Sequence, residues 1–492
     1  MTIDPRTPVV VGVAQVTQHP DDPADAVEPI ALMERVVRAA AADAGAPDLV
    51  AKLDHVGVVQ GAWRYSDPGR LIAEAVGSPT AKTSLSANGG NTPQSYMNAL
   101  AARIQAGQLD RAIFVGGETI WSRRRQRRAG LDIAVTKQEG IEPDERFQDD
   151  VPMTTDFEAA RGMDQPVNYY PLFDSAIRSS RGESIDEHRD RLAELWSGFN
   201  AVAVANDYAW FRTPMSADEI RDPSPSNRMV GFPYTKAMNS NWDLDQAAAV
   251  LLCSVEAAEA AGISRDQWVF PLAGTDAHDT YAVSERRDLH SSPAITEAGA
   301  KVFELAGLGP DDVAHIDLYS CFPSAVQVAA DALGFDQGRQ LTQTGGLTFA
   351  GGPLNNYVTH SIATMIGVLR NDPGVVGLVS ANGGYLTKHA IGLYATEPPA
   401  GGFEAVDVQD AVDEVPRTAV DEAFEGDATV EAYTVMHDHE GPQLGLCALK
   451  TPDGARTWGR VTDVDTASAM TANEAIGAVG ALDGDGVLQL SM

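Results

Sequence analysis

The strongest constraint on the fold of this chain is an internal repetition. The segment "DHVGVVQG" at residues 54–61 is similar to "AHIDLYSC" at residues 314–321, and a similar order of elements follows each copy. In each copy a helix then leads into a strand that ends in a glycine pair, at 116–117 in the first and 383–384 in the second. The repetition predicts two copies of one structural unit, separated by a long insertion.

Short apolar runs rich in β-branched residues alternate with amphipathic stretches along both copies. Bounded by glycine or aspartate, such runs predict buried strands at 8–13, 55–59, 111–115, 315–319 and 375–380. Apolar residues at helical spacing predict helices at 31–44, 94–106, 294–305, 323–333 and 361–369. The alternation predicts an α/β fold in which largely parallel strands are covered by helices on both faces.

The insertion and the C-terminal end have different patterns. From Trp121 to about Asp245 the sequence is polar and Arg-rich, with one long predicted helix at 185–204, which indicates an inserted lobe. After Tyr394 a stretch rich in proline, glycine and acids predicts a linker, and alternating apolar and polar residues then predict a small antiparallel β-barrel. The predicted segments are an N-terminal half at 1–122, an inserted loop domain at 123–246, the end of the N-terminal half at 247–300, a C-terminal half at 301–400, a linker at 401–427 and the barrel at 428–492.

Charge and composition exclude several classes of partner. The 36 basic and 69 acidic side chains give a net charge of −33, which repels nucleic acids and anionic membranes. Cys253, Cys321 and Cys447 lie far apart without metal-ligand spacing, so neither zinc nor a structural disulfide is expected. The first residues lack the profile of a signal peptide, and no apolar run reaches the length of a membrane span. We therefore expect a cytoplasmic protein.

Motifs along the chain resemble those of the thiolase superfamily. The segment "NTPQSYMNALAARIQAGQLDRAIFVGGETIWS" (91–122) resembles its nucleophile helix and following strand, and "MNSNWDLDQAAAVLLCS" (238–254) resembles its Asp-Gly-Ala-Ala-Ala strand entry. "LYSCFPSAV" (318–326) stands in the place of the Asn-Glu-Ala-Phe motif, while "GGLTFAGGP" (345–353) and "SANGG" (380–384) match the Gly-His-Pro and Cys-x-Gly regions. The resemblance is closest to the sterol-carrier-protein-type branch. It implies a duplicated five-layered fold of two βαβαβ-type halves and a coenzyme A or acyl-CoA ligand from lipid metabolism.

Thiolase chemistry needs side chains that this sequence lacks at the matching positions. It requires a nucleophilic cysteine at a helix N-terminus, an activating histidine and a second cysteine that moves protons. The three positions hold Gly90, Gly352 and Ala381. Because glycine and alanine offer neither a nucleophile nor a proton, we expect no thiolysis, no covalent acyl-enzyme and no covalently bound cofactor.

Tyr319 leaves a different chemistry open. Thiolase-like aldolases, which cleave carbon–carbon bonds without an acyl-enzyme, carry a Tyr-Asp-x-Phe motif where this chain has "YSCF" at 319–322. The resemblance implies noncovalent, retro-aldol-type chemistry with Tyr319 as proton donor or acceptor. In the alternative, the protein binds an acyl-CoA without catalysis and presents it to a partner enzyme. A polar pocket around Tyr319 would favour catalysis, and an apolar, sealed pocket would favour binding.

His360 and Cys321 are further candidates for catalysis. His360 follows the glycine-rich loop, and it either reaches into the space left by the missing histidine or is a structural histidine. Cys321 precedes a predicted helix whose dipole would lower the thiol pKa, and it would then serve a third alternative, an acyltransferase. The other interpretation of Cys321 is a small buried core thiol.

The remaining candidates are expected to bind the coenzyme. Guanidinium groups suit phosphates through paired hydrogen bonds, whereas a solvated loop is the other interpretation of an arginine run. The run at 122–130 supplies Arg123, Arg124, Arg125, Arg127 and Arg128. Glycines permit close ligand approach and asparagine amides donate to a thioester oxygen, which selects Asn88, Gly89, Gly90, Gly345, Gly346, Gly352, Asn382 and Gly383. Since thiolases pair through their core strands, we also expect a homodimer.

Overall fold

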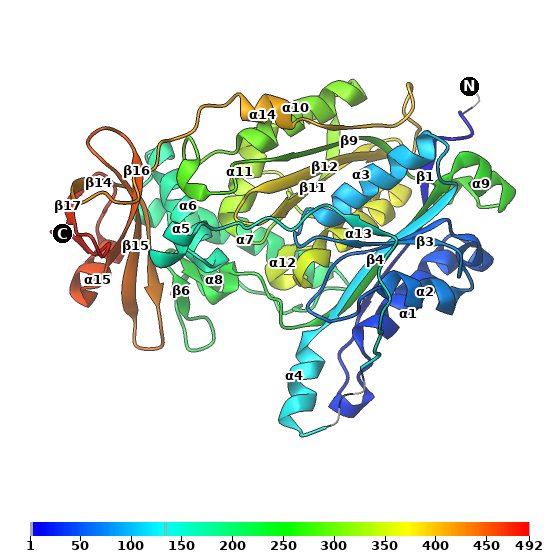
Figure 1. The fold of residues 1–492 in the computed structure, drawn as a ribbon, viewed down its shortest axis with the longest axis horizontal. Helices are drawn as coiled ribbons and strands as arrows, with labels where there is room; N and C mark the ends of the chain where they lie inside the picture. Colours follow the sequence, from blue (N-terminus) through cyan, green and yellow to red (C-terminus); the bar gives the residue numbers. More distant parts are fainter. Residues whose placement is uncertain (1–2, 132, 134, 492) are drawn as a thin grey trace.

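Two mixed β-sheets separated and covered by helices form the body of the protein, and a third, seven-stranded sheet, which two short strands of the inserted lobe join, lies at its C-terminal end (Figure 1). The computed structural model describes residues 3–131, 133 and 135–491, so the outer bounds of the first and last predicted segments, 1 and 492, lie outside it. None of the helices in these ranges has the length and apolar content that crossing a membrane requires.

The first sheet has the strand order β1-β8-β4-β2-β3-β5. Its strands are β1 (Pro8–Thr17), β2 (His55–Val58), β3 (Lys82–Ser86), β4 (Arg111–Thr119), β5 (Glu145–Phe147) and β8 (Asp245–Ser254). β8 runs antiparallel between β1 and β4, whereas β4, β2 and β3 are parallel to one another. Every residue of β8 is buried, which explains its nearly unbroken apolar sequence.

The second sheet repeats the core of the first. Its order is β10-β11-β12-β9-β13, with strands β9 (Phe270–His278), β10 (Val313–Asp317), β11 (Val376–Gly383), β12 (Lys388–Ala395) and β13 (Glu404–Asp407). β12 runs antiparallel between β9 and β11, as β8 does between β1 and β4. β11 is parallel to β10, as β4 is to β2. The repeated segments of the sequence contain β2 and β10, so the duplication is confirmed. The second unit begins at β9, and the boundary therefore falls before residue 270 rather than at residue 300.

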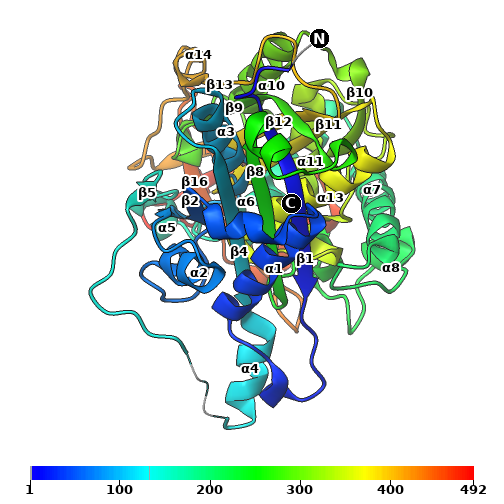
Figure 2. The same cartoon turned by 90° about the vertical axis from the view of Figure 1, so that its right-hand side faces the viewer.

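Helices complete five layers. α1 (Pro29–Asp43) and α2 (Pro68–Val76) cover the outer face of the first sheet, and α10 (Pro293–Ala306) with α11 (Pro323–Leu333) covers the outer face of the second (Figure 2). α3 (Thr92–Gln105) and α13 (Tyr357–Asn371) lie between the sheets and contact both. Shorter helices are α9 (Val255–Ala260), α12 (Gly346–Phe349) and α14 (Gln409–Asp413).

The inserted lobe is mainly helical and returns to the first sheet at one point. It contains α4 (Ile120–Arg128), α5 (Asp156–Ala160), α6 (Pro166–Arg181), α7 (Ile185–Ala205), α8 (Ala217–Arg221), β6 (Met229–Gly231) and β7 (Tyr234–Thr235). Within the lobe, β5 pairs with β3 in parallel, from Ser84 opposite Glu145 to Ser86 opposite Phe147. The edge of the first sheet is therefore covered by the chain itself.

The C-terminal strands form an open antiparallel sheet rather than the predicted closed barrel. The sheet order is β16-β15-β14-β17-β18, with β14 (Gly426–His437), β15 (Pro442–Lys450), β16 (Arg456–Val461), β17 (Val479–Leu482), β18 (Leu488–Gln489) and the helix α15 (Val464–Ala472). β18 has only two residues, and a single bridge from Arg460 to Val487 links this end to β16. Such a short strand cannot supply the ladder that closure needs.

Arg456 joins this C-terminal sheet to the body. Its guanidinium is fully buried, and Nε and Nη2 each donate a 2.7 Å hydrogen bond to the Glu431 carboxylate. Nη1 donates to the backbone oxygens of Ser284, at 2.9 Å, and Arg286, at 2.5 Å. Charge-assisted bonds of this kind are about twice as strong as neutral ones. Arg456 therefore fixes the 284–286 segment of the body.

Arg286 carries this connection further, to the turn between β11 and β12. Its Nη2 donates to Tyr385 O at 2.7 Å and to Thr387 Oγ1 at 3.0 Å. Arg286 is itself buried and packs over the ring of Phe173 in α6. The C-terminal sheet thus stabilises a turn of the second sheet through Arg456, which binds the backbone of Arg286, and through Arg286, which binds the turn.

Replacing Arg456 by methionine is expected to lower the free energy of unfolding by about 3–5 kcal/mol, because it leaves Glu431 and buried carbonyls without their donor. Hydrogen exchange should also rise in residues 284–286 and 385–387. Chemical denaturation and exchange mass spectrometry check both. The control is Arg460→Met on the same strand, since Arg460 donates to Asp485 O within the C-terminal sheet. An equal loss of unfolding free energy in both variants would show that Arg456 does not join the C-terminal sheet to the body.

Candidate functional site

A cavity of about 660 Å³ opens where the ends of β10 and β11 face the loop before α3. This volume suits a small-molecule ligand, and the carboxyl ends of parallel strands are a common place for such sites. Apolar side chains supply much of its wall, among them Val167, Phe322 and Leu347. Of the residues predicted from the sequence, the cavity brings together Asn88, Gly89, Gly90, Tyr319, Cys321, Gly352, Asn382 and Gly383.

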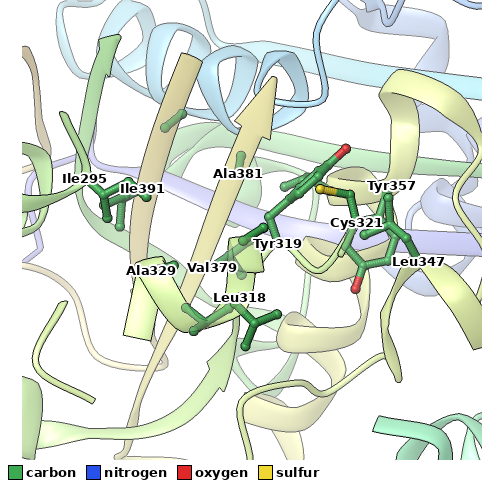
Figure 3. Packing of buried hydrophobic residues seen from close by; sticks show 14 of the residues in the cluster. Ile295, Leu318, Tyr319, Cys321, Ala329, Leu347, Tyr357, Val379, Ala381 and Ile391 are labelled. Carbon is green, nitrogen blue, oxygen red and sulfur yellow. The ribbon is translucent and has the colours of Figure 1, made fainter. Parts of the chain in front are cut away.

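Tyr319 occupies the space in front of Gly90, the residue that the sequence motifs match to the nucleophile position. A Cβ atom at residue 90 would overlap the Tyr319 hydroxyl and lie 2.5 Å from Asn382 O. Figure 3 shows Tyr319 beside Cys321, with Ala381 on the neighbouring strand. Any side chain at position 90 would have to displace the phenol, so the glycine at 90 and the tyrosine at 319 are linked sterically.

The Tyr319 hydroxyl is a free hydrogen-bond donor. It has no hydrogen-bond partner among the described residues, while the backbone N–H of Tyr319 donates to Ser380 Oγ at 3.0 Å. Burial, with Cys321 and Tyr357 nearby, raises the pKa of Tyr319 well above its usual value. The phenol therefore stays protonated at neutral pH, and it can donate a hydrogen bond but cannot act as a base.

Cys321 is a buried thiol. It lies just before α11, but burial raises the pKa of Cys321 to about 12, and this outweighs the helix dipole that favours the thiolate. The polar side chains beside its Sγ are the Tyr170 hydroxyl and the Asn382 amide, whose Nδ2 lies 3.7 Å away. A protonated thiol is a poor nucleophile, so the arrangement does not support the acyltransferase alternative. No set of three or more His, Cys, Asp or Glu side chains in the described ranges is grouped as metal ligands.

Tyr170 of α6 holds one wall of the cavity in place. Its hydroxyl accepts hydrogen bonds from Asn382 Nδ2 and Leu386 N, both at 2.9 Å, and donates to Gly384 O at 3.1 Å. Its ring stacks on Phe322 with 4.4 Å between centroids. No local sequence signal marked Tyr170, because it comes from a helix of the inserted lobe that is distant in sequence from every loop it contacts.

Lys388 is a second residue of the cavity that the sequence motifs did not assign. It begins β12 opposite Gly383, its side chain lines the cavity, and Nζ donates to Asn88 O at 2.5 Å. Its position in "GGYLTKHA" could have indicated that Lys388 lies near the site, since a strand that follows a glycine turn starts at the same end of the sheet at which the previous strand ended.

His360 and two of the predicted glycines lie outside the cavity. His360 is on α13, where Nδ1 bonds to Gln15 Oε1 of β1 at 2.9 Å, and burial lowers its pKa to about 3. Gly345 and Gly346 instead allow α12 to approach α7, since a Cβ at 345 would lie 2.5 Å from Ala203 N. The position of His360, several residues into a helix, turns its ring away from the site that the loop sequence suggested.

The arginine run is also separate from the Tyr319 cavity. It forms α4, where Arg125 donates to Pro20 O and Asp21 O at 2.6 Å each and lies over the Trp121 ring. Arg124 pairs with Asp243, and Arg128 is exposed. Arg123 and Arg127 line a different cavity, of about 870 Å³. The helical geometry points these side chains in different directions, so the five do not converge on one ligand.

Comparisons with known proteins identify the family. A family described as the additional C-terminal domain of thiolase-like protein type 1 matches residues 407–487, and a thiolase C-terminal domain-like family matches residues 275–356. A crystal structure of a monomeric SCP2-thiolase-like protein type 1 from Mycobacterium smegmatis has a TM-score of 0.85 and 30% identity, with 100% of both chains covered. The chain belongs to the SCP2-thiolase-like proteins of type 1. The thiolase resemblance of its sequence is thereby confirmed.

Other relatives match less of this SCP2-thiolase-like protein. An acetyl-CoA acetyltransferase of Methanocaldococcus jannaschii is 24% identical over 194 residues, which cover 39% of this chain and 48% of that protein. The chain spans about half the length of such curated relatives. The structure of the Ltp2-ChsH2(DUF35) aldolase has a TM-score of 0.60 at 17% identity, covering 80% of this chain and 99% of that one, so it shares the fold.

Substituting alanine for Gly90 in this SCP2-thiolase-like protein is expected to lower the free energy of unfolding by about 1–3 kcal/mol, because the methyl group overpacks against Tyr319. In a Tyr319→Ala background the same substitution should cost less, although the close approach to the backbone oxygen of Asn382 remains. Denaturant unfolding of the four proteins gives the coupling between the two sites. Gly367→Ala is the control, since a Cβ there meets no atom within 4 Å. Additive effects at 90 and 319 would contradict the steric link.

Proposed function

We propose that this protein binds acyl-CoA thioesters in the Tyr319 cavity and accepts no acyl group covalently there. The proposal rests on one observation, that the Tyr319 hydroxyl takes the space that a side chain at position 90 would need. The relatives named acetyl-CoA acetyltransferase support the ligand class. A thioester in this cavity would meet a neutral phenol where an active thiolase presents a thiolate.

The binding mode follows from the chemistry of the wall. The free Tyr319 hydroxyl donates a hydrogen bond to the thioester oxygen, at the end of the cavity where α3 begins and its dipole adds positive potential. The apolar side chains, including Val167 and Leu347, contact the acyl chain and the pantetheine arm. The mouth carries Trp242, which is 58% exposed and offers an aromatic face to the emerging ligand.

Two forms of the proposal differ in what happens after binding. In the first, which the largely apolar wall favours, the protein holds the thioester for a partner enzyme. In the second, a β-hydroxyacyl thioester splits into an aldehyde or ketone and a shorter thioester. Water takes the proton of the β-hydroxyl and returns a proton to the enolate carbon, while Tyr319 stabilises the enolate oxygen. The unpartnered hydroxyl favours this second candidate, in which Tyr319 donates to the oxyanion and does not remove a proton.

Calorimetric titration should detect coenzyme A and acyl-CoA binding to the intact protein. Tyr319→Phe should weaken the acyl thioesters by about 5- to 10-fold, the loss of one hydrogen bond, and should leave free coenzyme A nearly unchanged. The preference should be constant from pH 6 to 9, because the raised pKa keeps Tyr319 protonated throughout. Absence of heat with every ester would overturn the proposal. Incubation with β-hydroxyacyl thioesters separates its two forms: carbonyl release that Tyr319→Phe abolishes supports catalysis, and no release supports binding alone.

We also infer a monomer in place of the homodimer expected from the sequence. β5 pairs with β3 and so covers the sheet edge that a second copy would otherwise join. Light scattering coupled to size-exclusion chromatography should give the mass of one chain, 52.2 kDa. Glu145→Pro should increase self-association, because the register makes Glu145 N–H a donor to β3 and its loss exposes the β3 edge. A stable dimer of the unmodified protein would refute this inference.

A further inference from the structure

Lys388 places a buried positive charge in the cavity, and the binding mode described above does not use it. Its side chain is 8% exposed, and it is the sole basic residue among the described residues that line the cavity. The chain as a whole has a net charge of −33, so its mean field repels anionic ligands. A positive charge placed at the ligand site therefore indicates that the ligand has a negatively charged group at this point.

The ammonium group of Lys388 is incompletely satisfied within the protein. It has three N–H donors, and its one hydrogen bond is to Asn88 O, at 2.5 Å. Among the described residues, no carboxylate lies within ion-pair distance of Nζ, and the Asp150 carboxylate attracts it only from farther away. The Asp150 carboxylate lines the same cavity, but it accepts hydrogen bonds from Asn88 N, at 2.7 Å, and Asn88 Nδ2. Burial of a charge without a close counter-ion is costly, so an anionic group in the cavity would complete this site.

The position of Lys388 indicates which part of an acyl-CoA it meets. A Cβ at Gly89 would lie 2.9 Å from Lys388 Nζ, and a Cβ at Gly90 would overlap the Tyr319 hydroxyl. Consecutive Cα atoms are about 3.8 Å apart, so the ammonium and the phenol approach neighbouring residues of one turn. If Tyr319 holds the thioester oxygen, Lys388 faces atoms a few bonds away. The coenzyme phosphates lie at the far end of the pantetheine arm, so the anion that fits is a carboxylate on a short acyl chain.

We propose that Lys388 makes the cavity selective for acyl thioesters whose acyl group carries a carboxylate. The inference rests on the proposed function, because it presupposes that acyl-CoA binds beside Tyr319. It also explains Gly89, whose φ of 154° and lack of a side chain leave room for the lysine. The carboxylate accepts the remaining N–H donors of Lys388, while Tyr319 fixes the thioester at the other end of the acyl group.

Calorimetry with matched pairs of ligands tests this selectivity. Malonyl-CoA is compared with propionyl-CoA and succinyl-CoA with butyryl-CoA, since each pair has the same number of acyl carbons. The dicarboxylic ester of at least one pair should bind about tenfold more tightly, as expected for a charge-assisted hydrogen bond. Lys388→Met should abolish the preference while the affinity for the uncharged ester stays within about twofold. Lys301→Met is the control, because Lys301 pairs with Glu304 on the surface of α10 and should leave the preference intact.

The outcomes distinguish this inference from the proposed function. Equal affinity within both pairs overturns the selectivity but leaves acyl-CoA binding intact, whereas no binding of any ester overturns the proposed function. If Lys388→Met weakens all the esters equally, the ammonium contacts the shared coenzyme and the selectivity is refuted. A borohydride-stable adduct between Lys388 and a β-ketoacyl thioester would also refute it, by showing a neutral, nucleophilic amine.

Discussion

The contact between Tyr319 and Gly90 is the constraint on which the rest of the site depends. Gly90 belongs to the first repeat of the fold, while Tyr319 and Asn382 belong to the second, so the cavity lies where the two repeats meet. The close packing leaves no volume for a nucleophile at position 90. It also buries the phenol and keeps it protonated. This one contact thus leaves no room for a side chain at position 90 and places a neutral hydrogen-bond donor there.

The parts added to the repeats hold this arrangement in position. The inserted lobe contributes Tyr170, which binds backbone and side-chain groups of the turn between β11 and β12. From the opposite direction, Arg286 binds the same turn and is itself fixed by Arg456 of the C-terminal sheet. The turn carries Gly383 and leads into Lys388, both of which line the cavity. The additional C-terminal domain is therefore part of the structure that shapes the site.

Prediction from the sequence was most successful where the signal was local. The strands around His55 and His315 and the helices between them follow from short-range apolar periodicity, and the echo between the two copies correctly indicated the duplication. Prediction was least successful for residues whose role depends on the direction in which the side chain points. His360 was expected just before a helix at 361–369, but it lies inside α13, and the rotation of that helix turns its ring toward Gln15. The arginines of α4 likewise point apart because successive residues of a helix occupy different faces. The C-terminal strands were recognised, whereas closure into a barrel depends on the length of the last strand and was not.

By itself the sequence determined the thiolase-like family, and its motifs predicted glycine or alanine in place of the usual nucleophile, histidine and second cysteine. Tertiary structure decided what replaces them. Only the packing of the two repeats brings the Tyr319 hydroxyl over Gly90, and only the hairpin from β11 to β12 carries Lys388 to Gly89. Burial then sets the chemistry of both groups, since removal from water disfavours the charged form of the phenol and of the amine alike. Proximity across the chain and desolvation are properties of the folded molecule, and no local pattern of residues contains them.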